Sequence, residues 1–528
     1  MTTTTGPVYS YDEVPYPDKP YPQTHPDRLA TVGMLFGIPV QPIDNCRVLE
    51  LGCGRGGNLI PMAEQIPGSR FVGVELSQVQ VAEARQVVEQ LGLANIEIRH
   101  CNIMDVDAAF GQFDYIICHG VFSWVPREVQ DKMLDICAAH LKPHGIAYVS
   151  YNVYPGWHMR KMIRDMICYH TGRFREPRTR IQEARAFLDF LAQNAEDDSP
   201  YGKLLKSEAQ VVGNSEDGYL YHEHLEEFNL PCYFFQFAKQ VQTRGLQYLG
   251  EADLGSMWSG GLPPAVSATL DRMALDLIQM EQYLDFVQNR MFRQTLLCRK
   301  NVIIDRALHP DGLDRYHVAS PLVPAEPEMD LRSPTSMTFK TRDGEQTLTT
   351  NSPLMKSALV CLADAWPGSL PFAKLLSAAY GRANVQPMTG AEQLAGETFQ
   401  LGKFLLQSYL SGVIEFHCAA PCFSIQIGER PAASRLARLQ AETATSVTNL
   451  RHESLPLNEL ARHLLRHMDG TRDRMALVEI LGRLVQEGVL VPPAEEEAAG
   501  KPRDVNTRLA EAADRTLEFL ARNALLCY

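Results

Sequence analysis

The sequence is poor in the features that would place the chain in a membrane, outside the cell or on nucleic acid. No run approaches the roughly 18 apolar residues that a membrane helix needs. Residues 1–10 lack the basic and apolar regions of a secretory signal. The net charge of −13 disfavours general nucleic-acid binding, which requires a basic surface. We therefore expect a cytoplasmic protein with no membrane insertion.

The cysteines also lack the spacing of a metal site. All 12 stand singly, and no C-x-x-C pair occurs. Several lie within apolar runs, where a free thiol acts as a small hydrophobic side chain. The segment His222–His224 has no pair of histidines four residues apart, so we expect no zinc there. A polar cap over an active site and a structural role both remain open for this segment.

Residues 47–77 carry the strongest pattern in the chain. The apolar run 48–51 predicts a buried strand; glycines follow at 52, 54, 56 and 57, and then a helical pattern. A second predicted strand, 71–74, ends at Glu75. Glycines let the backbone approach a ligand, the next helix presents free N–H groups, and a carboxylate at a strand tip can accept both hydroxyls of a ribose. The stretch predicts one nucleotide-binding βαβ unit.

Further strands are predicted at 96–99, 113–117 and 146–150, with a helix at 78–91 that ends at Gly92. Such alternation is typical of an α/β fold. With Glu50 before the first glycine and the turn L-K-P-H-G at 141–145, the region resembles the class I S-adenosylmethionine (SAM) methyltransferases. His144 replaces a glycine usual in that turn. The glycines alone also match the dinucleotide-binding fingerprint, and an unliganded α/β domain is a further alternative.

The resemblance implies SAM as the cofactor. Asn102 occupies the place of an acid that bonds the adenine amino group in the family, and an amide can also accept that bond. The expected cofactor-binding residues are Glu50, Gly52, Gly54, Gly56, Glu75, Asn102, Ile103 and His119.

Aromatic and polar residues follow the fourth and fifth predicted strands, where open α/β sheets bind ligands. A ring of aromatic faces and oxygen acceptors suits an amine nitrogen, so we predict that these residues receive the methyl acceptor. His119 is a candidate to accept a proton. Two alternatives remain open: Trp124 anchors the core, or the aromatic residues only fasten the first domain to the second. The predicted catalytic residues are His119, Trp124, Tyr151, Asn152, Tyr154 and Trp157.

Two other segments have unusual compositions. Residues 7–27 are rich in proline, which favours an extended arm, and we expect the tyrosines at 9, 11, 16 and 21 to pack across the catalytic domain. Residues 158–185 are basic and helical. Such a run either grips an acidic polymer or forms a solvated helix face.

Residues 300–335 are expected to form an irregular linker, and 336–350 a hairpin around Asp343 and Gly344. Helical patterns at 353–365, 371–380 and 391–410, followed by strands at 413–417 and 423–427, resemble a winged helix. Residues 457–490 resemble a degenerate second copy, and a final helix covers 506–526. Because no recognition helix is basic, we interpret this region as a protein-contact module.

Four segments taken together extend the resemblance over most of residues 8–300: PYPDKPYPQTHPDRLA, YNVYPGW, H-E-H-L-E and QNRMFRQTLLC. They are similar to a bacterial family in which a SAM methyltransferase is joined to a methyltransferase regulatory domain. Rickettsial protein lysine methyltransferases are its best-known members. The resemblance implies protein lysine as the methyl acceptor. A small-molecule methyltransferase and an inactive SAM-binding scaffold are the alternatives.

We therefore predict an α/β, Rossmann-like class I methyltransferase domain with its arm at 1–195. A mainly helical regulatory-type domain is expected at 196–300, a linker and hairpin at 301–350, and a winged-helix-like region at 351–528. The expected partner is a protein substrate, and a homodimer is among the assemblies to be tested.

Overall fold

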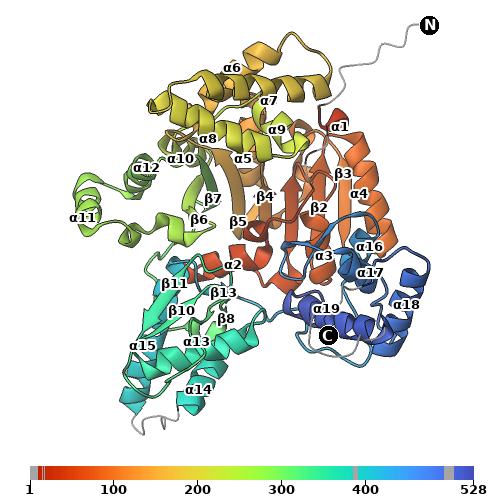
Figure 1. The fold of residues 1–528 in the computed structure, drawn as a ribbon. Coiled ribbons are helices and arrows are strands. Elements are labelled where there is room, and N and C mark those ends of the chain that lie inside the picture. Colours follow the sequence, from red (N-terminus) through yellow and green to blue (C-terminus); the bar gives the residue numbers. More distant parts are fainter. Residues whose placement is uncertain (1–9, 15, 17, 384–390, 493–504, 528) are drawn as a thin grey trace. The chain divides into compact units, whose positions relative to one another are not determined.

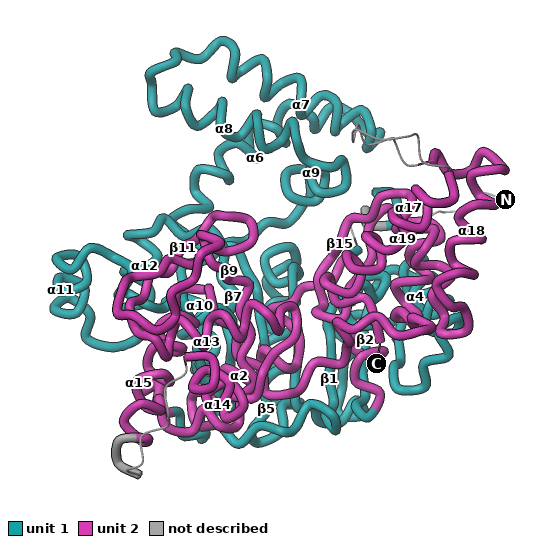
Figure 2. Tube along the Cα trace, turned by 60° about the horizontal axis from the view of Figure 1, so that its bottom comes forward, with its two compact units in different colours: residues 1–18, 38–60, 68–304 teal, residues 19–37, 61–67, 305–528 magenta. Residues whose placement is uncertain are grey.

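The computed structural model describes residues 10–14, 16, 18–383, 391–492 and 505–527. The chain divides into two compact units, each built from segments far apart in the sequence (Figure 2). Unit 1 comprises residues 1–18, 38–60 and 68–304. Unit 2 comprises residues 19–37, 61–67 and 305–528.

Unit 1 is organised around a sheet that, within the described residues, has seven strands in the order β3-β2-β1-β4-β5-β7-β6 (Figure 1). Neighbouring strands from β3 to β5 are parallel, whereas β7 is antiparallel to both β5 and β6. This topology confirms the predicted Rossmann-like fold. The strands are β1 (Arg47–Leu51), β2 (Arg70–Glu75), β3 (Ile96–His100), β4 (Phe113–Cys118), β5 (Leu141–Asn152), β6 (Leu246–Glu251) and β7 (Phe292–Arg299).

The central strands are continuous apolar runs because helices cover them on both faces. Val48, Leu49 and Leu51 of β1 are fully buried. The helices of this part are α3 (Leu59–Gln65), α4 (Gln78–Leu91) and α5 (Arg127–His140). α4 has the predicted bounds: the Ser77 hydroxyl accepts the Gln80 N–H, and Gly92 ends the helix in a left-handed conformation.

Beyond the end of β5 the chain forms a helical group with its own apolar core, which includes Ile163, Leu188, Leu205 and Leu220 (Figure 1). It consists of α6 (Trp157–Thr171), α7 (Pro177–Asn194), α8 (Pro200–Asn214) and α9 (Asp217–His224). The chain then forms α10 (Phe234–Thr243), β6, α11 (Pro264–Met273), α12 (Leu277–Gln288) and β7. The sheet therefore extends past residue 195, because β7 pairs with β5 from Ala147 to Asn152.

In unit 2, the first half contains two small three-stranded sheets. The predicted hairpin is confirmed: β10 pairs with β11 across a turn at Gly344. The elements are α2 (Pro26–Leu35), β8 (His317–Ala319), β9 (Val323–Pro324), β10 (Met337–Lys340), β11 (Thr347–Thr350), α13 (Pro353–Ala365), β12 (Leu370–Pro371), α14 (Phe372–Ala383), α15 (Ala391–Leu410) and β13 (Glu415–His417).

Two predictions for this half were wrong. Residues 300–335 are not only a linker, since they supply β8 and β9. Residues 423–427 do not form the second strand of a wing; Ser424 makes only an isolated bridge to Leu526. β13 pairs instead with β8, nearly 100 residues earlier in the chain. A short apolar run becomes a strand only where a partner edge is available.

The second half of unit 2 has a separate core that includes Ala437, Leu464, Leu481 and Leu517. Its two-stranded sheet precedes the helix pair 459–486, rather than following it as the sequence pattern indicated. The elements are α16 (Arg435–Thr443), β14 (Ser446–Thr448), β15 (Ser454–Pro456), α17 (Glu459–Arg466), α18 (Arg474–Gln486) and α19 (Val505–Arg522).

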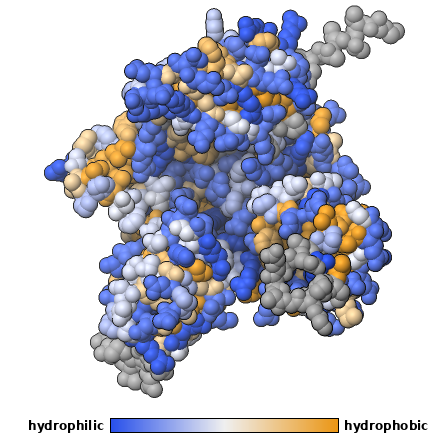
Figure 3. Space-filling model, viewed as in Figure 1, coloured by the Kyte–Doolittle hydropathy of each residue, from blue (hydrophilic) through white to orange (hydrophobic). Residues whose placement is uncertain are grey.

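The surface in Figure 3 is mostly polar, with apolar side chains gathered at places such as α11, where Met273 and the nearby Leu275 are exposed. Among the residues described, no helix has both the length and the apolar character required to cross a membrane.

Candidate functional site

The loop between β1 and α3 has a conformation that requires glycine. Gly52, Gly54 and Gly56 have φ values of +74°, +56° and +83°, which side chains rarely allow. A Cβ on Gly52 would lie 2.6 Å from Val121 Cγ2, in the loop that follows β4. The Val121 side chain of the loop after β4 therefore packs directly on the Gly52 backbone, at the edge of the sheet where this fold binds ligands.

Glu50 is in β1, two residues before this loop, and one of its carboxyl oxygens can bind a ligand. Its Oε1 accepts a hydrogen bond from Asn58 Nδ2 at 2.7 Å, whereas the buried Oε2 has no partner among the described residues. Burial raises the pKa of this carboxyl to about 8. A nearby cation would stabilise its ionised form. The ammonium group of SAM is such a cation, so this site fits the expected cofactor.

Glu75 is held at the tip of β2 by the backbone. Its Oε2 accepts the Gly54 N–H at 3.0 Å and its Oε1 accepts the Ser77 N–H at 2.9 Å. Each carboxylate oxygen retains a lone pair for a ribose hydroxyl. Asn102 and Ile103 follow β3, and Asn102 Oδ1 accepts the Met104 N–H at 2.9 Å. That oxygen can accept one more hydrogen bond, as an adenine amino group requires.

The amino-terminal arm reaches the glycine loop but differs from its prediction. Residues 10–13 form a short helix, α1 (Ser10–Glu13), rather than an extended segment. The Asp18 carboxylate accepts the Gly57 N–H at 2.8 Å, and the Asp12 carboxylate accepts a hydrogen bond from the Ser77 hydroxyl. Residues 19–37 belong to unit 2. Part of the arm therefore lies on unit 1 and part in unit 2.

Of the four tyrosines of the arm, Tyr16 is half-buried in unit 1 and its ring packs edge-on against His222, with centroids 5.7 Å apart. Tyr21 is half-buried in unit 2. Tyr9 and the side chain of Tyr11 lie outside the described residues. His222 also contacts the arm through its Nε2, 2.5 Å from the Val14 carbonyl oxygen.

At the end of β5, Asn152 presents a buried amide. Its backbone N–H donates to Ser123 Oγ at 2.9 Å, which joins β5 to the loop after β4. The side-chain Nδ2 is buried and has no hydrogen-bond partner in the described part of the chain. A buried amide group without a partner is unfavourable and marks a place where a ligand can bind.

Tyr154 belongs to a group of partly exposed aromatic rings. It stacks on His158, with centroids 3.9 Å apart and an interplanar angle of 14°, and lies 5.3 Å from Tyr233. Trp157 is buried and donates from Nε1 to Asn229 Oδ1 at 2.7 Å. Its ring meets Trp124 edge-on, with centroids 6.2 Å apart. The structure thus brings these three predicted residues to the end of β5.

Tyr151 points elsewhere, because successive strand residues face opposite sides of a sheet. Its ring is buried in the core and stacks on Phe237 at 4.1 Å. Its hydroxyl lies 3.0 Å from Thr295 Oγ1. The predicted catalytic role of Tyr151 does not fit this position, and we assign it to the core.

His119, at the end of β4, has its Nδ1 3.0 Å from the Tyr148 hydroxyl and 3.4 Å from Ser150 Oγ. Burial lowers the pKa of this imidazole to about 4, so His119 is neutral at pH 7. It can therefore orient an N–H group by accepting a hydrogen bond, but it is a weak base.

Sequence reasoning missed the residues that hold these groups in place. Asn58 positions Glu50. Ser123 positions Asn152, and its carbonyl oxygen also accepts the Leu230 N–H at 2.8 Å. Asn58 could have been found as the polar residue directly after the glycines. Ser123 carries no such signal, because serine is common in loops.

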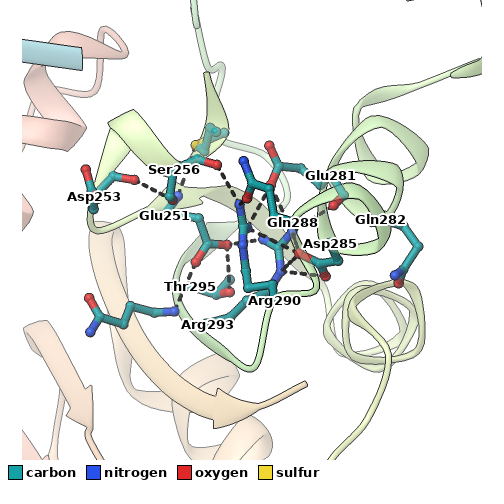
Figure 4. Close-up of polar contacts among 12 residues, drawn as sticks. Glu251, Asp253, Ser256, Glu281, Gln282, Asp285, Gln288, Arg290, Arg293 and Thr295 are labelled. Atoms are coloured by element: carbon teal, nitrogen blue, oxygen red, sulfur yellow. Dashed lines mark hydrogen bonds and ion pairs between the residues drawn. The ribbon is translucent and has the colours of Figure 1, made fainter. Parts of the chain in front are cut away.

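A buried charge cluster supports the strand next to β5 (Figure 4). The guanidinium of Arg293 on β7 donates to Asp285 at 2.8 Å, to Glu281 at 3.0 Å and to Glu251 at 2.6 Å. All four side chains are buried. Thr295 connects the cluster to β5, since its hydroxyl contacts both Glu251 and Tyr151. The cluster fixes β7, and β7 pairs directly with Asn152 through Phe292.

Comparisons with known proteins match three parts of the chain. Residues 48–145 match the model of a methyltransferase domain, residues 216–299 that of a predicted methyltransferase regulatory domain, and residues 429–525 that of the PKMT C-terminal winged helix domain. The winged helix match falls on the region that the sequence pattern suggested was a degenerate copy.

Whole-length relatives agree with these matches. An uncharacterized protein, RP789, of Rickettsia prowazekii is 38% identical over 524 residues, which cover 98% of this chain and 93% of that protein. The structure of PKMT2 from Rickettsia typhi is 30% identical, with a TM-score of 0.85, and the match covers 97% of this chain and all of that one. PKMT2 has also been solved in complex with AdoHcy, with a TM-score of 0.86 to this chain.

AdoHcy is what remains of SAM after methyl transfer, so the bound PKMT2 structure and the glycine loop identify the same cofactor. The chain therefore belongs to the bacterial family of SAM-dependent methyltransferases in which a methyltransferase domain is combined with a methyltransferase regulatory domain and a PKMT-type winged helix domain.

Proposed function

We propose that the protein transfers the methyl group of SAM to lysine side chains of proteins. The observation that carries this proposal is the buried, unpartnered amide of Asn152 beside the aromatic rings of Tyr154, His158 and Tyr233. An amine is small enough to be oriented by one amide and favours aromatic surroundings. The resemblance of the four sequence segments to rickettsial protein lysine methyltransferases supports the same acceptor.

The cofactor side is assigned to the residues around the glycine loop. Glu50, positioned by Asn58, would hold the ammonium of SAM, Glu75 would bind the ribose, and Asn102 with Ile103 would border the adenine. The bound cofactor supplies a methyl group on a positively charged sulfur, which is already activated for transfer. The protein's contribution is therefore mainly to position the acceptor and to exclude water.

The acceptor side is assigned to Asn152, Tyr154, Trp157, Trp124 and His119. A lysine must be neutral before its nitrogen can attack, and its unperturbed pKa is about 10.4. Removal from water lowers that value, since the charged form is disfavoured. The Asn152 side-chain oxygen and the neutral His119 ring then accept hydrogen bonds from the remaining N–H groups. In this scheme the lysine releases its proton to solvent water before its nitrogen is buried, and no strong base is needed.

The test is methyl transfer from radiolabelled SAM to a host lysate. We expect label in precipitated protein, and methyl-lysine after complete hydrolysis. Asn152→Ala should reduce the protein-bound label at least tenfold while SAM affinity and melting temperature stay close to those of the wild type. Label confined to small molecules would contradict a protein substrate. Asn152→Ala with full activity would place the acceptor elsewhere.

A further inference from the structure

A second group of buried polar atoms without partners lies in the helical part of unit 1. Arg164 on α6 and His224 at the end of α9 are both buried. Among the described residues, Arg164 Nη1 and both ring nitrogens of His224 make no hydrogen bond. Asn229, in the loop after α9, has a buried Nδ2 that also lacks a partner. Three side chains from two helices and a loop therefore hold unused hydrogen-bonding groups.

These residues gather around the two tryptophans of the proposed acceptor site. The guanidinium of Arg164 lies over the Trp124 ring at 5.9 Å, and that of Arg160 over the Trp157 ring at 5.5 Å. Asn229 Oδ1 accepts the Trp157 Nε1–H. Both arginines disfavour the charged form of His224, and together with burial they lower its pKa to about 3. The polar atoms thus share one neighbourhood beside the acceptor site.

The two arginines differ in their partners. Arg160 lies 3.5 Å from Glu208 and 3.5 Å from Glu223. Arg164 has no carboxylate within ion-pair distance among the residues described; its Nη2 donates only to the backbone oxygen of Glu226. Burial accordingly lowers the pKa of Arg164. Glu226, Asp165 and Glu223 favour the charged form from beyond ion-pair distance, but burial outweighs them. A buried cation with no carboxylate in contact is unfavourable unless a ligand supplies one.

We infer that Arg164, His224 and Asn229 form a binding site for a carboxylate group. A guanidinium N–H, an imidazole N–H and an amide N–H can all donate to one carboxylate, and charge-assisted bonds of this kind are strong. Within the basic segment 158–185, Arg164 thus binds one carboxylate. The segment as a whole need not attract acidic polymers.

The position of this site indicates the source of the carboxylate, an inference that rests on the proposed function. Arg164 is seven residues after Trp157 on α6, which corresponds to about 10 Å along the helix. An extended peptide spans that distance in about three residues. The carboxylate is therefore that of an aspartate or glutamate about three residues from the methylated lysine in the acceptor protein.

The first experiment measures carboxylate binding without methyl transfer. Tryptophan fluorescence of the full-length protein is titrated with glutarate, and with the uncharged glutaramide as a reference. We expect a saturable change with glutarate only, and at least tenfold weaker binding in Arg164→Met and His224→Phe. Arg164→Lys keeps the charge but not the planar donors, so it should bind with intermediate affinity.

The control is Lys161→Met, which removes an exposed cation of the same helix that pairs with Asp165 at 2.7 Å. It should bind glutarate as the wild type does. Melting temperatures establish that each variant is folded. No response of the wild type to glutarate, or an equal response in folded Arg164→Met, would overturn the site.

The second experiment uses peptides with one lysine and either glutamate or glutamine three residues before or after it. We expect kcat/KM at least tenfold higher for a glutamate peptide, a ratio near one in Arg164→Met, and an unchanged ratio in Lys161→Met. Glutarate binding without peptide preference would overturn the acidic-substrate assignment and support a free carboxylate ligand. Glutarate binding with no peptide or protein methylation would contradict the proposed function but support the site.

Discussion

Unit 1 contains two buried clusters that are each centred on an arginine, and they differ in how completely the arginine is satisfied. Each nitrogen of the Arg293 guanidinium has a carboxylate partner, from Glu251, Glu281 or Asp285 (Figure 4). Arg164 has one backbone oxygen, and its other terminal nitrogen has no partner among the described residues. Both guanidiniums also lie over an aromatic ring.

This difference separates a structural network from a binding site. In the Arg293 cluster, carboxylates balance the charge of the arginine, and the network orders the strands and helices that contribute to it. An open network leaves unfavourable buried donors, which binding of a complementary group relieves. The Arg293 cluster orders β7 beside β5, whereas the Arg164 cluster has donors available for the carboxylate that we propose.

Breaking the closed cluster should have the largest effect on stability. Arg293→Met removes the cation that contacts all three buried carboxylates and leaves Arg290 beside only two of them, so we expect unfolding free energy to fall by about 3–5 kcal/mol. Urea unfolding followed by circular dichroism measures the change. Adding Glu251→Gln, Glu281→Gln and Asp285→Asn to this variant should restore part of the loss, because none of the three buried side chains then carries a charge. Wild-type stability of Arg293→Met would show that the cluster is not structural.

The closed cluster should also respond to pH. Burial raises the pKa of Glu281 to about 7 from its ordinary 4.5. The stabilisation of the folded protein by protonated Glu281 is fully present below pH 4.5. It is lost as the pH rises through 7. Between pH 5 and 8 the unfolding free energy of the wild type should therefore fall by about 2–3 kcal/mol relative to that of Glu281→Gln. Melting temperatures across this range measure the difference. The exposed Glu227→Gln is the matched control and should follow the wild type; parallel profiles for all three proteins would contradict the prediction.

Glu75 is a buried acid with backbone partners instead of an arginine. Glu75→Gln keeps the size of the side chain but removes the charge that strengthens its bonds to ribose. We expect SAM binding to weaken by about 1.5–3 kcal/mol, measured by calorimetry. Unchanged SAM affinity in Glu75→Gln would mean that the ribose binds elsewhere. The control is Glu281→Gln, which should leave SAM affinity at the wild-type value.

The smallest effect on stability is expected at the open cluster. Arg164→Met replaces a poorly compensated buried cation by an apolar side chain of similar length, so unfolding free energy should change by about 1 kcal/mol or less. The same urea experiment as for Arg293→Met allows a direct comparison. A loss as large as that of Arg293→Met would show that Arg164 is structural, and the contrast between the two clusters would disappear.

The predictions made from sequence succeeded where the structure depends on residues close together in the chain. The glycines at 52, 54 and 56 adopt the left-handed conformations that a tight loop requires. α4 has its predicted bounds because Ser77 and Gly92 cap it locally. The βαβ unit, the hairpin at Gly344 and the identity of the cofactor follow from such short-range patterns, since a few adjacent residues suffice to form each of them.

Contacts between distant segments decided the rest. Tyr151 faces the core because α10 covers that side of β5 and Phe237 stacks on its ring, and no local pattern reveals which side a distant helix will cover. Residues 423–427 lack a partner edge, while β13 finds one in β8. Arg164 and His224 are 60 residues apart in the sequence, and only the packing of α6 against α9 brings their polar groups together. The sequence by itself determined the fold class and the cofactor loop, whereas burial by remote residues decided which side chains are left to bind the acceptor.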